Sequence, residues 1–240
     1  MQWTLGIALL WFSFSVVAEP LRLGIGTHKP PYVFQDEARG LEYEIVAATA
    51  KHAGFTLQVL HLPMERLHWL LRRGEIDAIA TTNDRSGIQA FYSEPHIYYQ
   101  NVAVALRARN YKIERIADLS NFSVSAFQRA RFLLGNEFQR MAQNNPRYRE
   151  EAQQIARNRL LYSGRIEVVV ADIRILRYLN REVLHQVDVS QPLAEYWIFA
   201  PTPYQVGFRR EAQRNRFNQG LAAIHASGEY RAIERRYAMY

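Results

Sequence analysis

The sequence predicts an α/β fold in two lobes. Short apolar runs alternate with helical patterns between residues 21 and 80, which is the order of an α/β sheet with helices on its faces. A long extended segment at 98–110 then breaks the pattern, and a second α/β series follows it. With 240 residues, the chain is long enough for two small lobes that each bury a core.

The first series alternates strands and helices. In chain order it contains a strand at 21–26, a helix at 40–54, a strand at 55–62, a helix at 64–74 and a strand at 76–80. The first helix places Leu41, Ile45, Ala48 and His52 on one face. The second helix ends at Gly74, a residue type that favours the left-handed backbone of a helix C-terminus.

The second series has a similar pattern. It contains a strand at 122–127, a helix near 130–142, a helix ending at 162–165, a strand at 167–172 and a helix from Ile173 to about Val183. After the proline-containing stretch at 200–208, the chain closes with an amphipathic helical tail. Its apolar face is formed by Phe217, Leu221, Ile224 and, beyond a Ser-Gly break, Ile233. This order fits two lobes with two crossings between them.

The net charge of +7 raises the question of nucleic-acid binding. The 27 arginines, however, are spread along the whole chain, and neither a block of like charges nor an RNA-binding motif is present. We therefore expect no nucleic-acid partner. The positive charge favours anionic ligands or partners by long-range attraction.

The first residues predict export. An apolar run at 5–17 ends in a small-residue site at Ala18, the pattern of a cleaved signal peptide over residues 1–18. As a helix the run is roughly 20 Å long, too short for a hydrocarbon core of about 30 Å. The chain has no Cys, so it has neither a thiol to acylate nor disulfides. We expect a soluble, non-lipidated periplasmic protein.

Segments along almost the whole of the predicted mature chain carry a resemblance to a known family. In order they read "LRLGIGTHKPPYVF", "GLEYEIVAATAKHAG", "RRGEIDAIATTNDR", "YSEPHIYYQNVAVAL", "IADLSNFSVSAFQ", "SGRIEVVVAD" and "VGFRREAQRNRFNQGLAAIHASGEYRAIERRY". The chain resembles the bacterial extracellular solute-binding proteins of family 3, the polar-amino-acid-type periplasmic components of ABC importers.

The resemblance implies a type II periplasmic-binding-protein fold with a ligand cleft between two lobes. Lobe 1 would contain residues 19–101 and 204–240, and lobe 2 residues 102–203. The protein would bind a small polar or anionic, amino-acid-like solute as a monomer and deliver it to an ABC permease. It would perform no catalysis and need no metal or cofactor.

The resemblance also implies ligand-binding residues in lobe 1. Arg85 follows the strand at 76–80, where family members grip a ligand carboxylate with a bidentate arginine; a solvated surface arginine is the alternative. Thr81 and Thr82 lie at the strand end, where the family uses hydroxyls and amides, although ordinary turn residues also fit. Tyr32 would stack on a planar ligand or pack the lobe edge. Arg66 would add a second cationic contact or remain solvated.

In lobe 2, Asp172 follows a strand and precedes a helix. It would pair with a ligand amino group, act as a helix N-cap, or do both. Gln128 begins the other lobe-2 loop, where many amino-acid binders continue with Gly-Ser or Gly-Thr. This chain continues with Arg129 and Ala130, which favours a larger or more anionic ligand.

Two alternative functions stay open at this point. An exported dehydratase acting on prephenate or arogenate would need a cleft carboxyl as general acid, and Glu167 and Asp172 are the candidates in lobe 2. A periplasmic sensor or adaptor with a degenerate cleft would suit the altered lobe-2 loop. The sequence has no P-loop, no HExxH pair and no GxSxG elbow, and its histidines are more typical of polar or semi-buried residues than of metal ligands.

Overall fold

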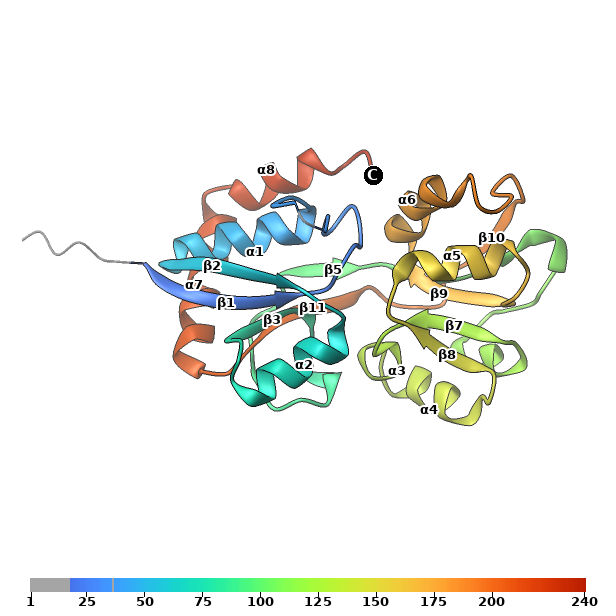
Figure 1. The fold of residues 1–240 in the computed structure, drawn as a ribbon, viewed down its shortest axis with the longest axis horizontal. Helices are drawn as coiled ribbons and strands as arrows, with labels where there is room; N and C mark the ends of the chain where they lie inside the picture. The colour runs from blue at the N-terminus through green and yellow to red at the C-terminus, as the bar shows by residue number, and fades with distance from the viewer. Residues whose placement is uncertain (1–17, 36) are drawn as a thin grey trace, which may run out of the picture.

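A computed structural model describes residues 18–35 and 37–240 as two lobes, each built around its own β-sheet (Figure 1). Of the predicted signal peptide, only Ala18 lies within the described residues. No helix among the described residues is both long enough and apolar enough to cross a membrane.

The sheet of lobe 1 combines strands from both ends of the chain. Its order is β2-β1-β3-β11-β4, and β5 also pairs with β11. These strands are β1 (Glu19–Ile25), β2 (Phe55–His61), β3 (Ala78–Thr82), β4 (Phe91–Tyr92), β5 (Ile97–Tyr99) and β11 (Thr202–Phe208). The strands β1, β2 and β3 are parallel, whereas β11 runs antiparallel to β3.

Four α-helices belong to this lobe: α1 (Leu41–His52), α2 (Met64–Arg73), α7 (Glu211–Ala226) and α8 (Glu229–Arg236). The predicted C-terminal apolar face is confirmed, because Phe217, Leu221, Ile224 and Ile233 are all buried. The predicted end of α2 is also confirmed, since Gly74 has the left-handed φ of 78°. His52, in contrast to Leu41 and Ile45 on the same helix, is exposed.

The sheet of lobe 2 has the order β10-β6-β9-β7-β8. Its strands are β6 (Asn101–Leu106), β7 (Val124–Phe127), β8 (Tyr148–Glu151), β9 (Val168–Asp172) and β10 (Leu193–Tyr196). The α-helices of this lobe are α3 (Ala130–Leu133), α4 (Asn136–Asn144), α5 (Gln154–Tyr162) and α6 (Ile173–Val183). The single helix predicted near 130–142 is wrong: Gly135, with φ of 92°, separates α3 from α4.

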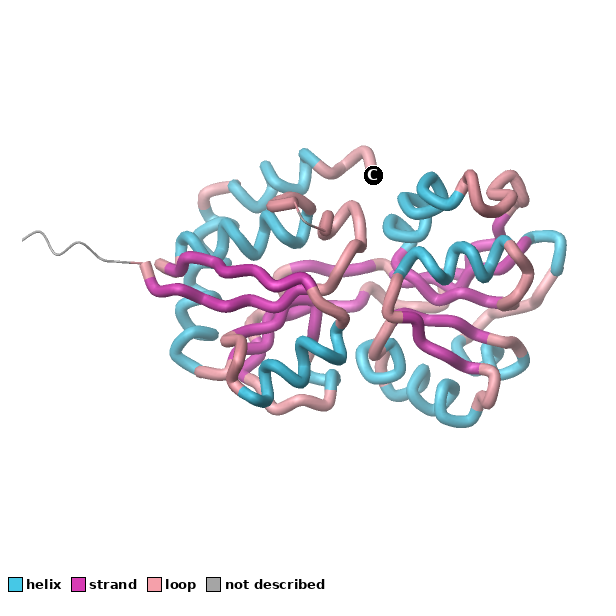
Figure 2. The backbone as a smooth tube through the Cα atoms, in the orientation of Figure 1, coloured by secondary structure: helices cyan, strands magenta, loops and turns pink. Residues whose placement is uncertain are grey.

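Two crossings join the lobes (Figure 2). The first runs through Gln100, between β5 and β6, and the second lies between β10 and β11. The Gln100 side chain ties the crossings together by donating to the carbonyl oxygen of Phe199 at 3.0 Å. Asn101 adds a second link by donating to Thr202 Oγ1 at 3.1 Å.

Candidate functional site

A cleft of about 610 Å³, counting space open to solvent, lies between the lobes. The parallel strands β1, β3, β7, β8 and β9 all point their carboxyl ends toward it, the usual place for a ligand in open α/β sheets. The lining side chains include Thr27, His28, Lys29, Thr81 and Tyr99 from lobe 1, and Asn101, Phe127, Gln128, Gln154 and Asp172 from lobe 2.

A buried ion pair forms the lobe-1 wall. Lys29 Nζ lies 2.9 Å from Glu42 Oε2, and both side chains are almost wholly shielded from solvent. Glu42 also accepts hydrogen bonds from Tyr99 Oη at 2.6 Å, Thr81 Oγ1 at 2.8 Å and His96 Nε2 at 3.0 Å. This carboxylate therefore receives the several partners that a buried charge requires.

The pKa values of this pair follow from its surroundings. Burial alone raises the pKa of Glu42, but Lys29, His96 and the hydrogen bonds outweigh burial and hold the pKa well below its usual value. Burial lowers the pKa of Lys29, while the charge of Glu42 opposes that shift. Glu42 is thus a carboxylate at neutral pH.

Thr81 joins this network at the cost of backbone strain. Its φ is 55°, in the left-handed region that β-branched residues avoid. In this conformation its hydroxyl both contacts Lys29 Nζ and donates to Glu42. Non-glycine residues with such φ values cluster at functional sites, so the strain is consistent with a ligand-binding position at the end of β3.

Tyr32 connects the two walls. Its ring stacks on Tyr99 with centroids 3.8 Å apart, and its hydroxyl donates to Asp172 Oδ2 at 3.2 Å. Tyr32 itself is buried behind Tyr99 and does not line the cleft. It contacts two lining residues and bridges the lobes.

Asp172 caps a helix and lines the cleft. Its Oδ1 accepts from the backbone N–H groups of Arg174 and Ile175 at 2.9 and 3.1 Å, which is the N-cap geometry expected from the sequence. Its Oδ2 accepts from Gln100 N at 2.9 Å in addition to Tyr32. Burial outweighs these bonds and raises the pKa of Asp172 to about 6.

The lobe-2 loop after β7 is filled by the protein's own side chains. Arg129 has a left-handed φ of 70°, and its backbone N–H donates to Glu150 Oε2 at 2.7 Å. The N–H of Arg131 donates to the other oxygen of Glu150 at 3.0 Å. The amides at the start of α3 therefore bind a carboxylate from β8. Gln128 lines the cleft, and its Oε1 accepts from Glu65 N at 3.2 Å.

The other predicted residues lie elsewhere. Arg85 is exposed on the turn after β3, outside the lining residues, with its guanidinium beside Gly135 of lobe 2. Arg66 is exposed on α2 and stacks over Trp69 at 4.3 Å. Thr82 is buried, and its hydroxyl has no hydrogen-bond partner among the described residues. The structure thus brings Thr81, Gln128 and Asp172 to the cleft, with Tyr32 behind them, and leaves Arg85, Arg66 and Thr82 outside.

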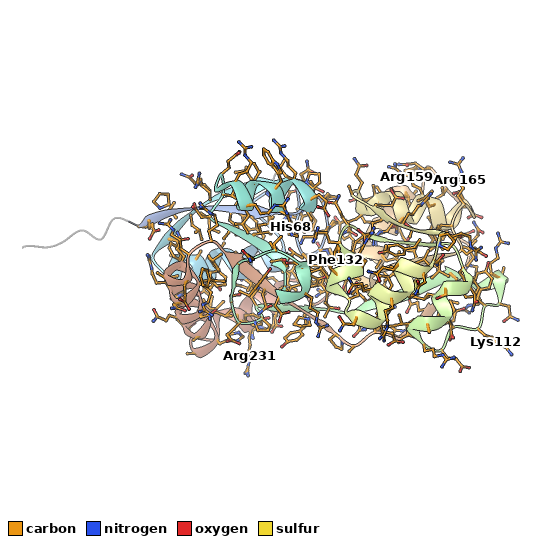
Figure 3. All side chains as sticks on the ribbon, turned by 90° about the horizontal axis from the view of Figure 1, so that it is seen from below. His68, Lys112, Phe132, Arg159, Arg165 and Arg231 are labelled. Atoms are coloured by element: carbon orange, nitrogen blue, oxygen red, sulfur yellow. The ribbon has the colours of Figure 1, made fainter. Side chains whose placement is uncertain are left out.

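Polar contacts close the lobes against each other around the cleft. On one side Arg129 reaches Glu65 at 2.8 Å and the carbonyl of Ser86, and on the other His28 contacts Glu182 at 2.9 Å. Figure 3 shows His68 of α2 and Phe132 of α3 near this junction. Burial, with a smaller contribution from Arg129, lowers the pKa of His68 to about 3.

Sequence analysis missed the residues of the lobe-1 network. Lys29, Glu42, His96 and Tyr99 come from three separate segments, so no local motif joins them. One signal was available: the chain uses 27 arginines but only three lysines, and Lys29 directly precedes two prolines in a loop after a strand. Among the described residues, no group of three or more His, Cys, Asp or Glu side chains could hold a metal ion.

The cleft, the two crossings and the two sheets define a two-lobed binding protein. Residues 21–239 match the family model of bacterial extracellular solute-binding proteins, family 3, and the chain belongs to this family. The resemblance and the type II periplasmic-binding-protein fold inferred from the sequence are therefore confirmed.

A curated relative is the membrane-bound lytic murein transglycosylase F of Desulfosudis oleivorans, 25% identical over 217 residues. The match covers 86% of this chain but 45% of that protein, so the chain spans about half the length of this relative.

Solved structures with the same fold include the following three. A histidine kinase sensor domain similar to periplasmic binding proteins has a TM-score of 0.76 and 20% identity, over 92% of this chain and 96% of that one. An ancestral arginine-binding protein bound to arginine has a TM-score of 0.73 and 20% identity, over 92% of this chain and 99% of that one. An ancestral amino-acid-binding protein, a precursor of cyclohexadienyl dehydratase, has a TM-score of 0.67 and 17% identity, over 91% of this chain and 95% of that one.

Proposed function

We propose that the protein captures a small polar or anionic, amino-acid-like solute in the interlobe cleft and delivers it to an ABC importer. One observation carries this proposal: Lys29 from lobe 1 and Asp172 from lobe 2 line the same cleft, one presenting an ammonium and the other a carboxyl group. Such a pair suits a ligand with separated polar or charged groups, because each lobe adds one charged side chain to the cleft wall.

The network behind each residue supports this role. Glu42 fixes the position of Lys29, and the N-terminus of α6 fixes that of Asp172, so little side-chain freedom is lost when a ligand binds. Thr81, Gln128 and Asn101 add hydrogen-bonding groups along the same cleft. We expect a dissociation constant in the micromolar range, which corresponds to a binding free energy of about −8 kcal/mol.

Residues 1–18 are proposed to direct export to the periplasm, where the closed protein would present its solute to a permease in the inner membrane. Membership of an extracellular solute-binding family supports this location. The proposed monomer needs no cofactor for either step.

The two alternative functions are weaker. Of the carboxyls named for a dehydratase, Glu167 bonds to Ser123 N and to Arg147, at the opposite end of β9 from the cleft. Asp172 lines the cleft with a raised pKa, as a general acid requires, but it has no second acidic residue among the described lining residues. One observation supports the sensor function: the backbone amides at the start of α3 already bind Glu150, so they are not available to a ligand carboxylate.

A thermal-shift screen tests the proposal. Purified protein is screened against amino acids, organic acids, oligopeptides and polyamines, and we expect one class to raise the melting temperature by several degrees. Lys29→Gln should abolish this rise, whereas Lys112→Gln, at an exposed lysine of lobe 2, should not. Absence of any shift would refute solute capture, and turnover of prephenate would establish the dehydratase instead.

A further inference from the structure

A buried arginine lies in lobe 2 without an ion-pair partner. Arg157 of α5 is 1% exposed, and no carboxylate among the described residues lies within 4.0 Å of it. Its Nη1 donates to the carbonyl oxygen of Val170 at 2.8 Å, while its Nε has no partner. Burial lowers the pKa of Arg157 to about 10, so the guanidinium stays charged at neutral pH.

The guanidinium lies at the cleft edge of the sheet. The last paired residues of β7 and β9 are Ser125 and Val169, so Phe127 and Val170 lie beyond the paired part of the two strands. Arg157 Nη1 bonds to the carbonyl oxygen of Val170, and its guanidinium carbon lies 5.8 Å from the ring centroid of Phe127. Phe127 lines the cleft, so the charge sits directly behind the cleft wall.

Neighbouring carboxylates do not neutralise Arg157 by contact. Glu151 has the strongest electrostatic effect on it, but its carboxylate is partly exposed and is ion-paired with Arg149 at 3.1 Å. Asp172 acts more weakly, and its oxygens already accept four hydrogen bonds. A buried charge without a partner is costly, which makes Arg157 unusual unless an anion completes the site.

Other groups that could receive a ligand carboxylate are already engaged or displaced. The amides of α3 bind Glu150, and Arg85 is exposed outside the cleft. Lys29 lines the cleft, but Glu42 offsets its charge, so Lys29 offers a ligand a polar contact and not a net positive charge. Among the described residues, Arg157 is therefore a buried cation near the cleft whose charge no contacting carboxylate offsets.

We propose that Arg157 selects the charge of the ligand, attracting a carboxylate group to the lobe-2 wall beside Phe127. The solute then carries at least one net negative charge, as a dicarboxylate or an acidic amino acid does. This inference rests on the proposed function and narrows it from polar solutes to anionic ones.

Matched acid and amide pairs test the proposal: glutamate with glutamine, aspartate with asparagine, and succinate with succinamide. Isothermal titration calorimetry should show that the protein binds the acid of at least one pair 10-fold or more tightly than its amide. Arg157→Met should weaken binding of that acid by about 10-fold, because the charge acts through the cleft wall rather than by direct contact, and should bring acid and amide within about threefold.

Stability separates a ligand-binding role from a structural one. Because Arg157→Met removes a buried, unpaired charge, the ligand-free variant should resist urea as well as the parent protein or better. Arg159→Met is the matched control, since Arg159 lies two residues further along α5 and points outward from lobe 2 (Figure 3). The control should preserve both affinity and selectivity.

Several results would overturn the proposal. An amide that binds as tightly as its acid, or an unchanged preference in Arg157→Met, would show that Arg157 does not select charge. Should Arg157→Met and Arg157→Lys both unfold, the residue is structural. Binding of uncharged or cationic solutes alone would refute this inference but leave solute capture intact, whereas no binding of any probe in the wider screen would refute both.

Discussion

The two walls of the cleft treat buried charge in opposite ways. In lobe 1, the Lys29 ammonium is matched by Glu42, whose oxygens also receive Thr81, His96 and Tyr99. In lobe 2, the Arg157 guanidinium has one carbonyl partner and no carboxylate in contact among the described residues. A matched pair contributes rigidity to its own lobe, whereas an unmatched charge leaves electrostatic free energy for a ligand. We therefore expect lobe 2 to tolerate loss of its buried charge better than lobe 1 does.

The largest expected effect comes from breaking the lobe-1 pair. Glu42→Gln leaves the Lys29 ammonium buried without a counter-charge, and we expect a loss of about 3–5 kcal/mol in the free energy of unfolding, measured in urea. Arg157→Met, which removes a charge rather than stranding one, should lose little or nothing. The surface pair of exposed Glu211 and half-buried Arg214 supplies a control, since Glu211→Gln should cost no more than about 0.5 kcal/mol. Equal losses in Glu42→Gln and Arg157→Met would erase the difference between the walls.

The next effect is on the pH dependence of stability. The contributions of Glu42 in lobe 1 and Asp172 in lobe 2 should change with pH in opposite directions. Glu42 has a depressed pKa, so its stabilisation is complete above 4.5 and is lost as the pH falls toward its folded pKa. Asp172 has a pKa raised from 3.8 to about 6, so the folded state binds the extra proton more tightly. Its ionisation costs stability as the pH rises between these values, by about 3 kcal/mol in total.

Urea unfolding of the parent protein and Asp172→Asn between pH 4 and 7 checks this sign. Asparagine still caps α6, so the variant isolates the charge. The stability of the parent relative to Asp172→Asn should decrease as the pH rises to about 6 and then level off. A relative stability that increases over this range would mean that the hydrogen bonds to Asp172 outweigh its burial.

The sequence predicts features that depend on neighbours in the chain and misses those that depend on distant contacts. Asp172 was recognisable because an acidic residue between a strand and a helix is a typical N-cap. Gly135, which divides the predicted helix near 130–142, was overlooked because a glycine inside a helical pattern is often tolerated.

In the candidate site, too, residues whose role depends on their neighbours in the chain are predictable, and residues whose role depends on distant contacts are not. Thr81 and Gln128 follow predicted strands directly, so the sequence places them at the cleft. Glu42 lies in the first turn of α1, and only its contacts with the distant residues His96 and Tyr99 distinguish it. Arg157 is one of 27 arginines, and only its burial beside β9 distinguishes it.

A smaller effect is expected where the walls meet. Arg129 of lobe 2 contacts Glu65 and Ser86 of lobe 1 with a strained φ of 70°. Arg129→Gly removes the contacts and relieves the strain, so the free energy of unfolding should change by less than about 1 kcal/mol. The lobes should nevertheless separate more readily, which small-angle X-ray scattering detects as a larger radius of gyration.

The control for this variant is Arg131→Gln, because Arg131 pairs with Glu150 inside lobe 2 and, among the described residues, forms no hydrogen bond or ion pair with lobe 1. It should leave the radius of gyration unchanged. If Arg129→Gly does so as well, the other contacts between the lobes, such as His28 with Glu182, are sufficient to keep them closed.

The smallest effect is expected at Arg85, the residue that the sequence favours most. Its guanidinium lies on the exposed rim beside Gly135, where water screens its charge, whereas Arg157 lies behind the cleft wall. Arg85→Ala should therefore change the affinity for glutamate, aspartate or succinate by less than threefold and stability by less than about 0.5 kcal/mol. Calorimetry with the same acid and amide pairs compares the two arginines directly. A loss of 10-fold or more in Arg85→Ala, with Arg157→Met unaffected, would return the carboxylate-binding role to lobe 1, because closure around a ligand must then bring the rim arginine inward.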